Sequence, residues 1–296
     1  MKSLCQPYDA VALLFVALGL TPGVLAAPAK AAPKPAPPPA LEAPTVERFP
    51  TVVAAFQEVL RTPARVIAVG EYHQTNATTA VRSSLSRFAD EILPVLAKSA
   101  TDLLVETWVS DGDCGARETR VTRQIETTTE RPPETENEIV ALLRRAKGAG
   151  MQPHILSMSC KDYRHVTDRR GDTDFAKMLK LTRDRLQDEV LRCLDAPNPR
   201  SGQVDRVVAV YGGALHNDLY PAAADKPYAF GPSLYAKAGG SYVEVDLFVP
   251  EYIRDDARLV AEPWFQLFRQ NADATGALLI RRSERSFVIL FPPSRS

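Results

Sequence analysis

The chain carries no net charge and contains few residues of the types used in redox and metal chemistry. Its 296 residues include 36 Lys+Arg and 36 Asp+Glu, but only 4 His, 4 Cys and 4 Met. A neutral chain lacks the excess of positive charge that binds phosphate backbones, which argues against a dedicated nucleic-acid-binding protein. Hydrophobic residues make up 45% of the sequence, whereas disordered chains are poor in them. The composition therefore predicts a folded protein with a partner other than nucleic acid.

An apolar run at residues 10–20 lies close to the N-terminus. Lys2 precedes the run, and small residues that include Ala26 follow it, which is the pattern of a secretory signal peptide. The run is short for a membrane-spanning helix and is followed by Pro22, which disfavours the alternative of a retained anchor. We expect a signal peptide at residues 1–26 and a mature protein that is exported, either periplasmic or secreted, without a membrane span.

The next segment, residues 27–44, contains seven prolines and almost no large apolar side chain. Such a composition favours an extended polyproline conformation and cannot bury a core. We predict a Pro/Ala-rich linker at 27–44, followed by a single α/β domain at 45–296. The length of that remaining segment suits one domain.

Within the domain, short runs rich in β-branched residues alternate with helical patterns. The predicted strands are 65–70, 102–106, 153–158, 205–211 and 241–248. Apolar residues at helical spacing occur between these strands at 81–96, 135–148 and 175–194, and again around 257–270. Strands separated by helices favour a mainly parallel sheet with helices on both faces. The last two apolar runs, 276–281 and 286–291, predict C-terminal strands that pair as an antiparallel hairpin.

Two connections are longer than ordinary loops, at residues 107–134 and 217–240. The second contains four aromatic residues, Tyr220, Tyr228, Phe230 and Tyr235. These side chains could form the wall of a ligand pocket. They could equally cover an edge of the sheet, and the sequence does not distinguish the two interpretations.

Two of the histidines follow predicted strands in the same G-x-x-H pattern. The motif is G-E-Y-H at 70–73, after the first strand, and G-A-L-H at 213–216, after the fourth. Glycine permits a sharp turn at a strand end, so His73 and His216 are expected at the carboxyl edge of the sheet, where ligands of parallel α/β proteins bind.

Two glutamates belong to the same predicted edge, because Glu106 ends the second strand and Glu71 lies two residues before His73. A divalent metal with an open position for water could be held by His73, Glu106 and His216. A metal-free site is the alternative, in which one histidine takes a proton from water and a glutamate orients its ring. In both alternatives the catalytic residues are Glu71, His73, Glu106 and His216.

The other two histidines are expected outside this site. His154 opens a predicted strand and so lies at the opposite end of the sheet. His165 follows the third strand near Asp162 and Arg164, either as a contact to the substrate or in a solvated loop.

The motif at 70–73, the acidic end of the second strand at Glu106 and the motif ending at His216 resemble the superfamily of ChaN-like haem-binding proteins, erythromycin esterases and TraB/Tiki proteins. The similarity covers roughly residues 60–220 and consists of sparse motifs on an α/β order of elements. It implies a metal-binding or proton-transfer role for the two histidines, with the glutamates as supporting carboxylates.

The chain departs from this superfamily in two ways. Glu71 and His73 are spaced one residue more closely than the corresponding pair of the erythromycin esterases, which disfavours hydrolysis of macrolide esters. ChaN-like proteins are typically lipid-anchored, whereas Cys5 here precedes the apolar run and does not form a lipobox.

Removal of the signal peptide leaves three cysteines, Cys114, Cys160 and Cys193. Cys114 and Cys160 both follow predicted strands, and exported proteins form disulfides, so we predict a bridge between them. Cys193 lies on the apolar stripe of its helix and would be a buried thiol. A catalytic Cys160, activated by Lys161, is the alternative, but no histidine is placed to serve it.

Two main functions fit these observations. The first is a hydrolase that activates water against an ester, amide or peptide bond in a small-molecule or peptide substrate. The second is a ChaN-like protein that binds haem or a metal without turnover, for which Tyr72 and Tyr211 are further candidate haem ligands besides the histidines. A surface protein with a degenerate site is a third interpretation. The sequence does not predict the oligomeric state or the identity of a metal.

Overall fold

The structure is a computed structural model that describes residues 37–200 and 205–294. The described residues belong to one compact unit. The predicted signal peptide (1–26) and most of the predicted linker (27–44) lie outside the described residues. Within the described part of the chain, no helix combines the length and the apolar character needed to cross a membrane.

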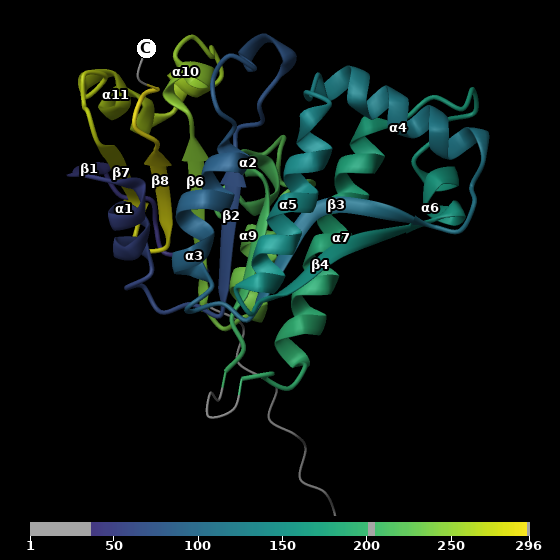
Figure 1. Cartoon of the computed structure of the whole chain (residues 1–296), viewed down its shortest axis with the longest axis horizontal. Coiled ribbons are helices and arrows are strands. Elements are labelled where there is room, and N and C mark those ends of the chain that lie inside the picture. Colours follow the sequence, from purple (N-terminus) through teal and green to yellow (C-terminus); the bar gives the residue numbers. More distant parts are fainter. Residues whose placement is uncertain (1–36, 201–204, 295–296) are drawn as a thin grey trace, which may run out of the picture. The chain divides into compact units, whose positions relative to one another are not determined.

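A single sheet of eight strands organises the domain (Figure 1). Its strands are β1 (Thr45–Phe49), β2 (Val66–Glu71), β3 (Asp102–Asp111), β4 (Gln152–Ser159), β5 (Val208–Gly213), β6 (Tyr242–Phe248), β7 (Ala277–Ser283) and β8 (Ser286–Leu290). Their order across the sheet is β1-β7-β8-β6-β2-β5-β3-β4. All pairs from β8 to β4 are parallel, whereas β7 is antiparallel to both β1 and β8. The α/β fold class, the mainly parallel sheet and the C-terminal hairpin are therefore confirmed.

The helices connect the strands and pack on the sheet. They are α1 (Val52–Val59), η1 (Asn76–Thr78), α2 (Ser84–Arg87), η2 (Phe88–Ile92), α3 (Leu93–Leu96), α4 (Ala116–Thr129), α5 (Glu134–Gly148), α6 (Cys160–His165), α7 (Phe175–Asp195), α8 (Ala214–Asn217), α9 (Gly231–Lys237), α10 (Pro250–Ile253), η3 (Leu259–Ala261) and α11 (Pro263–Gln270). The helix predicted at 81–96 begins at Ser84, and its middle turn η2 is a π-helix. The helix predicted around 257–270 is α11, which begins at Pro263.

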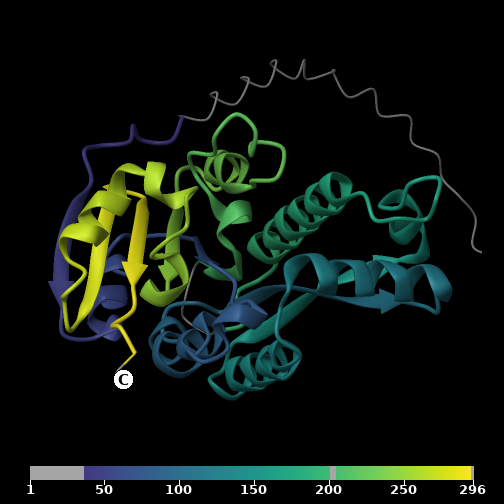
Figure 2. The same ribbon diagram turned by 90° about the horizontal axis from the view of Figure 1, so that it is seen from above.

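Helices cover both faces of the sheet. Successive residues of a strand point to opposite faces, so each strand contributes side chains to both cores. In β2, Ile67 and Val69 join the core formed with α1, α2, α3, α5 and α11. Val66 and Ala68 join a second core on the other face, formed with α7 and α9. Figure 2 shows the teal helix α5 and the green helix α7 on opposite sides of β3 and β4.

Strands β3 and β4 extend past the rest of the sheet and end near α4 and α6 (Figure 1). Strand β3 pairs with β5 only as far as Val105, and its register against β4 shifts between Val105 and Trp108. The strand then continues to Asp111. The expected strand end at Glu106 is therefore wrong: Glu106 lies inside β3, at an irregularity of the kind that re-aims a side chain.

The two long connections contain secondary structure. Residues 107–134 form the outer part of β3 and the helix α4, whose Val121 packs with Tyr163 of α6 in a small third core. Residues 217–240 contain α9, and Phe230 and Tyr235 are buried in the core beneath the sheet. These two aromatic side chains thus cover a face of the sheet and not its edge, which differs from the second interpretation of this connection.

Candidate functional site

A histidine and a buried glutamate lie together at the carboxyl end of β2. Glu71 is the last residue of the strand and is 7% exposed. Its Oε1 lies 2.7 Å from Nδ1 of His73, and its Oε2 accepts a hydrogen bond from the hydroxyl of Tyr211 at 2.5 Å. The imidazole is thus oriented by a carboxylate that is itself held by a second side chain, which is the arrangement that fixes a catalytic histidine in one tautomer.

The charge state of Glu71 follows from its neighbours. Burial by itself raises the pKa of this carboxyl, but the hydrogen bond from His73, the charges of His73 and Arg131, and the hydrogen bond from Tyr211 outweigh it, so the pKa is lower than usual. Burial and the nearby Glu71 carboxylate raise the pKa of Tyr211 well above its ordinary value. Glu71 is therefore an anion and Tyr211 a neutral donor at neutral pH.

Arg131, from the connection between α4 and α5, contacts the same histidine. Its Nη2 lies 2.8 Å from Nδ1 and 2.5 Å from Nε2 of His73. A carboxylate needs a donor and a guanidinium needs an acceptor, so one ring nitrogen cannot serve both. Nδ1 therefore donates to Glu71. An atom this close to both ring nitrogens lies over the ring and not on the in-plane lone pair of Nε2, so the guanidinium packs against the imidazole.

A second histidine and glutamate pair lies at the end of β5. His216, in α8, is 3% exposed, and its Nδ1 donates to the carbonyl of Tyr228 at 2.7 Å. This leaves Nε2 facing Oε1 of Glu106 at 3.5 Å. A lone pair on Nε2 would not attract this carboxylate oxygen, whereas a proton on Nε2 would let the two groups bond.

The two pairs meet at Gly213, the last residue of β5. Its N–H donates to Oε2 of Glu106 at 2.6 Å. A Cβ at this position would lie 2.9 Å from Nε2 of His73 and 3.6 Å from Oε2 of Glu106. Glu71, His73, Glu106 and His216 thus lie close together at one edge of the sheet, Glu71 and His73 as a hydrogen-bonded pair and Glu106 and His216 in contact at 3.5 Å, while their catalytic and metal-binding roles stay predictions.

The glycines of this edge serve close packing and not the sharp turns expected from the sequence. A Cβ on Gly212 would lie 2.4 Å from Oε2 of Glu106, and a Cβ on Gly70 would lie 2.5 Å from Oδ1 of Asp246. Neither glycine has a positive φ. The absent side chains leave the space that these carboxylates occupy.

A buried acidic cluster adjoins His216. It consists of the buried Glu244 and Asp246 and the half-buried Asp218, with the half-buried Arg282 as the cation among them. Arg282 bonds Glu244 at 3.1 Å and lies 4.0 Å from each of the other two carboxylates. One cation does not balance three carboxylates, and burial raises the pKa of Asp246 to about 7 and that of Glu244 well above its usual range.

Both tyrosines predicted as haem ligands are held by other side chains. Tyr211 is 2% exposed and its hydroxyl is engaged with Glu71. The hydroxyl of Tyr72 bonds to Asp256 and accepts from Arg258. Neither tyrosine can approach an iron without breaking these contacts.

A different group of residues has the spacing of metal ligands. Among the described residues, Asp102, His154 and Cys193 have ligand atoms within 4.8 Å of one another, so this buried group could hold a metal ion. The trio predicted from the sequence does not meet this distance. Both oxygens of Asp102, however, already accept hydrogen bonds from Arg206, at 2.8 and 2.9 Å, and Oδ1 also bonds Nε2 of His154 at 2.8 Å. The spacing of the ligand atoms would suit a metal ion. The ion would have to replace the bonds from Arg206, however, and the positive charge of this arginine opposes a second cation at Asp102.

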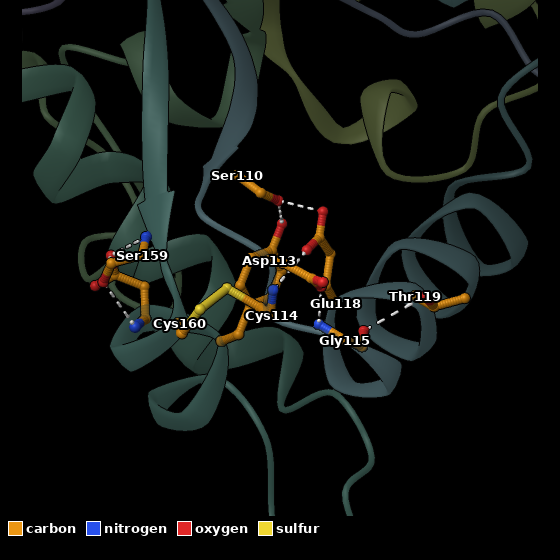
Figure 3. The surroundings of a disulfide bond; sticks show 10 residues. Ser110, Asp113, Cys114, Gly115, Glu118, Thr119, Ser159 and Cys160 are labelled. Carbon is orange, nitrogen blue, oxygen red and sulfur yellow. Dashed lines mark hydrogen bonds between the residues drawn. A yellow bond between two sulfur atoms is a disulfide. The ribbon is translucent and has the colours of Figure 1, made fainter.

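The predicted disulfide between Cys114 and Cys160 is confirmed (Figure 3). It joins the segment after β3 to the first residue of α6, and the carboxylate of Glu118 accepts from Ser110 and from the backbone N–H of Cys114 beside it. Cys193 is a buried free thiol, as expected. Because Cys160 is bonded, its catalytic alternative is excluded in this state. His165 is exposed at the end of α6, as the solvated interpretation proposed.

Sequence reasoning did not find Arg131 or the Asp102 group. Arg131 follows a helix in a segment interpreted as a loop, and no motif marks it. Two members of the Asp102 group were noted in the sequence, but separately. His154 was expected at the opposite end of the sheet and Cys193 on a buried helical stripe, and no pattern linked the two residues to Asp102.

A small pocket opens beside the first pair. The free volume inside it is about 10 Å³, and its lining includes His73, Arg131, Ser83 and Glu138. This is room for about one water molecule and not for a whole ligand. Comparisons with models of known families, with curated proteins and with solved structures found no match, so the function of this edge is argued from its own residues.

Proposed function

We propose that this protein is a hydrolase that cleaves an ester, amide or peptide bond by metal-free acid–base chemistry. One observation carries the proposal: two histidine–glutamate pairs meet at Gly213, and one of them can accept a proton while the other can donate one. Nε2 of His73 presents a lone pair, whereas Nε2 of His216 faces a carboxylate oxygen. Such a combination places a proton acceptor and a proton donor at one site.

His73 is the general base in this proposal. Glu71 holds its Nδ1–H, so the imidazolium that forms when Nε2 takes a proton from water is stabilised by an ionised carboxylate. The 29% exposure of the His73 side chain leaves the ring accessible from the pocket.

The Glu106–His216 pair is the general acid. It holds a proton between a nearly buried imidazole and a carboxylate fixed by Gly213. That proton can pass to the leaving oxygen or nitrogen when the acyl bond breaks, while His73 retains the proton taken from water. The attacking water supplies the hydroxyl that forms the new acid, and the two transfers balance.

The resemblance to the superfamily of ChaN-like proteins and erythromycin esterases supports a proton-transfer role for these histidines. The disulfide supports the export expected from the N-terminal sequence, because such bonds persist in oxidising compartments. Both points belong to the proposal.

The experiment is a screen of chromogenic esters, amides and peptides with the wild type and with His73→Ala and His216→Ala, before and after treatment with a chelator. We expect each single variant to lose a factor of 10² to 10⁴ in kcat/KM. The double variant should lose no more than the worse single one, because groups that act as a unit are not additive. His165→Ala is the matched control, since His165 is exposed and lies outside the site.

Two results would contradict the proposal. Activity that the chelator removes and one divalent ion restores would favour a metal site. Turnover that neither histidine variant affects would place the catalytic site elsewhere.

A further inference from the structure

The outer part of strand β3 has an open edge. The strand pairs with β5 only as far as Val105, but it continues to Asp111 and keeps β4 on its other side. Among the described residues, no strand pairs with the β5-facing edge beyond Val105. None of residues 107–111 is fully buried, and Val109 is 52% exposed. An edge of this kind presents backbone N–H and C=O groups that can pair with an added strand.

The alternation along β3 indicates which backbone groups point to the open edge. In a strand, the N–H and C=O of successive residues point to opposite sides, in step with the alternation of the side chains. At the start of β3 the N–H of Asp102 donates towards β5, to the carbonyl of Val207, and Leu104 of the same set packs in the second core. Trp108 packs against that core as well. The N–H and C=O groups of Trp108 and Ser110 therefore point to the open edge.

The open edge begins at the candidate site. Glu106 lies at the irregularity of β3, and its Oε2 accepts from the N–H of Gly213 at the end of β5. In a continued ladder this N–H would donate to a backbone carbonyl of β3. The side chain of Glu106 takes that bond instead, so the two strands separate at a residue of the candidate site.

We infer that residues 108–110 bind an extended peptide, which adds a strand to the open edge and thereby places one of its peptide bonds at the Glu106–His216 pair. The inference rests on the proposed function and narrows its substrate to a polypeptide in an extended conformation. A strand advances about 3.3 Å per residue, so a peptide paired beside Trp108 reaches Glu106 within about two or three of its own residues.

The outer ends of β3 and β4 are held in place before a peptide binds. The disulfide between Cys114 and Cys160 joins the segment after β3 to the helix after β4 (Figure 3). On the covered face of the two strands, the hydroxyl of Ser110 bonds that of Tyr163 at 2.8 Å. A fixed edge loses little conformational freedom on binding, so more of the hydrogen-bond energy contributes to affinity. Val109 points to the opposite face, where its exposed side chain can contact an apolar residue of the peptide.

The first test changes the peptide. The probe is a capped, fluorescent peptide of eight residues in which valine alternates with serine, and its binding to His73→Ala, which lacks the proposed base, is measured by fluorescence anisotropy. Two further probes carry N-methyl groups, one on every valine nitrogen and the other on every serine nitrogen. Only alternate residues of an added strand face β3, so we expect one of these two probes to bind about tenfold or more weakly while the other keeps most of its affinity. Equal affinities of the two, or no binding of the parent probe, would overturn the inference.

The second test changes the protein. Ser110→Pro, made in the His73→Ala chain, removes the N–H that points to the open edge. Ser110→Ala in the same chain is the matched control, because it keeps that N–H and removes only the hydroxyl that bonds Tyr163. We expect the control to bind the parent probe as His73→Ala does, and Ser110→Pro to bind it about tenfold or more weakly. Equal binding by the two variants would contradict the assigned edge.

Amide hydrogen exchange of His73→Ala, followed by NMR, gives an answer even if Ser110→Pro does not fold. The bound probe should slow exchange at the N–H groups of Trp108 and Ser110, whereas the N–H of Val109, which faces β4, should exchange slowly with and without the probe. Exchange at Trp108 and Ser110 that the probe does not slow would overturn the inference. Protection of these two groups that grows with protein concentration, without the probe, would show a second copy of the chain on the edge and would also contradict it.

These readouts need no turnover, so the two proposals can fail separately. If the probe binds the open edge but the wild type cleaves no ester, amide or peptide, the peptide-binding edge stands and the hydrolase is wrong. If cleavage requires His73 and His216 but responds neither to N-methylation of a peptide nor to Ser110→Pro, the hydrolase stands and its substrate does not bind at the open edge.

Discussion

The backbone N–H of Gly213 donates to Oε2 of Glu106 over 2.6 Å, so the last residue of β5 fixes a carboxylate from the middle of β3. This bond forms at the point where β3 separates from β5, just after Val105. The strand irregularity that aims Glu106 and the glycine that receives it thus belong to one junction. The candidate site is assembled by the packing of strand ends and not by a loop.

Gly213→Ala tests that junction. The added methyl group would lie 2.9 Å from Nε2 of His73, which is closer than a Cβ atom tolerates, so the ring must shift. We expect hydrolytic activity to fall about 100-fold and unfolding free energy to fall by about 1–3 kcal/mol. Activity assays and thermal unfolding measure the two effects. Gly148→Ala is the control, because a Cβ there would meet no atom within 4 Å; equal activities of the two variants would contradict the assigned geometry.

The Cys114–Cys160 bond should stabilise the outer ends of β3 and β4. It closes a loop between residues 46 positions apart, for which loop-closure entropy gives about 4 kcal/mol. We expect the double variant Cys114→Ala/Cys160→Ala to unfold at a lower temperature than the wild type and to be insensitive to reductant. Thiol counting on the denatured mature chain should find one thiol without reductant, at Cys193, and three with it. Three thiols in the non-reduced sample would show that the bond does not form.

Asp246 should make the protein less stable at high pH. Burial raises its pKa from 3.8 to about 7, against the opposing charge of Arg282. Between these values the folded state holds a proton that the unfolded state has lost, so stability falls as the pH rises from 4 to 7. Asp246→Asn removes this cost and should raise the unfolding free energy at pH 8 by about 1–3 kcal/mol, with little change at pH 4.

Thermal unfolding of Asp246→Asn across that pH range measures the effect. The exposed Asp188 supplies the control variant Asp188→Asn, which should show the same pH dependence as the wild type. A stabilisation of Asp246→Asn that is equal at pH 4 and pH 8 would mean that the carboxyl does not hold a proton in the folded state.

His154 should have the opposite role. The hydrogen bond to Asp102, together with its contact to Cys193, raises the pKa of His154 to about 9. A raised histidine pKa adds stability that is complete below the ordinary value of 6.5 and is lost as the pH rises through 9. We expect His154→Gln to lower the unfolding free energy at pH 6 by about 3 kcal/mol and to approach the wild type at pH 10. Denaturant unfolding at both pH values checks this, and the exposed His165→Gln should match the wild type at each.

Metal addition distinguishes the two interpretations of the same group. If Asp102, His154 and Cys193 bound a divalent ion in place of the bond to Arg206, that ion would raise the unfolding temperature of the wild type and not of His154→Gln.

The order of strands and helices was predictable because burial leaves a periodic signature. The apolar runs at β2, β5 and β6 and the helical stripe of α7 are regular enough to identify from sequence. Strand β1 and helix α1 were missed, since β1 is an exposed edge strand without a continuous apolar run. Helix α4 was missed because its single fully buried residue, Val121, gives almost no apolar stripe.

The sequence by itself determined which side chains reach the carboxyl edge of the sheet. Residues that end parallel strands must converge there, so Glu71, His73 and His216 were identified without coordinates. It also determined that two cysteines beyond neighbouring strand ends could bond.

Only the tertiary structure decided how those residues share protons. Pairing depends on differences of a few tenths of an ångström in the distances between atoms far apart in the chain, and these distances are set by strand register and by the space at Gly213. The same is true of Arg131, whose place on His73 follows from the packing of a loop 58 residues away. Periodicity predicts which face of a helix or strand is buried, but it does not predict which atoms on that face will contact one another.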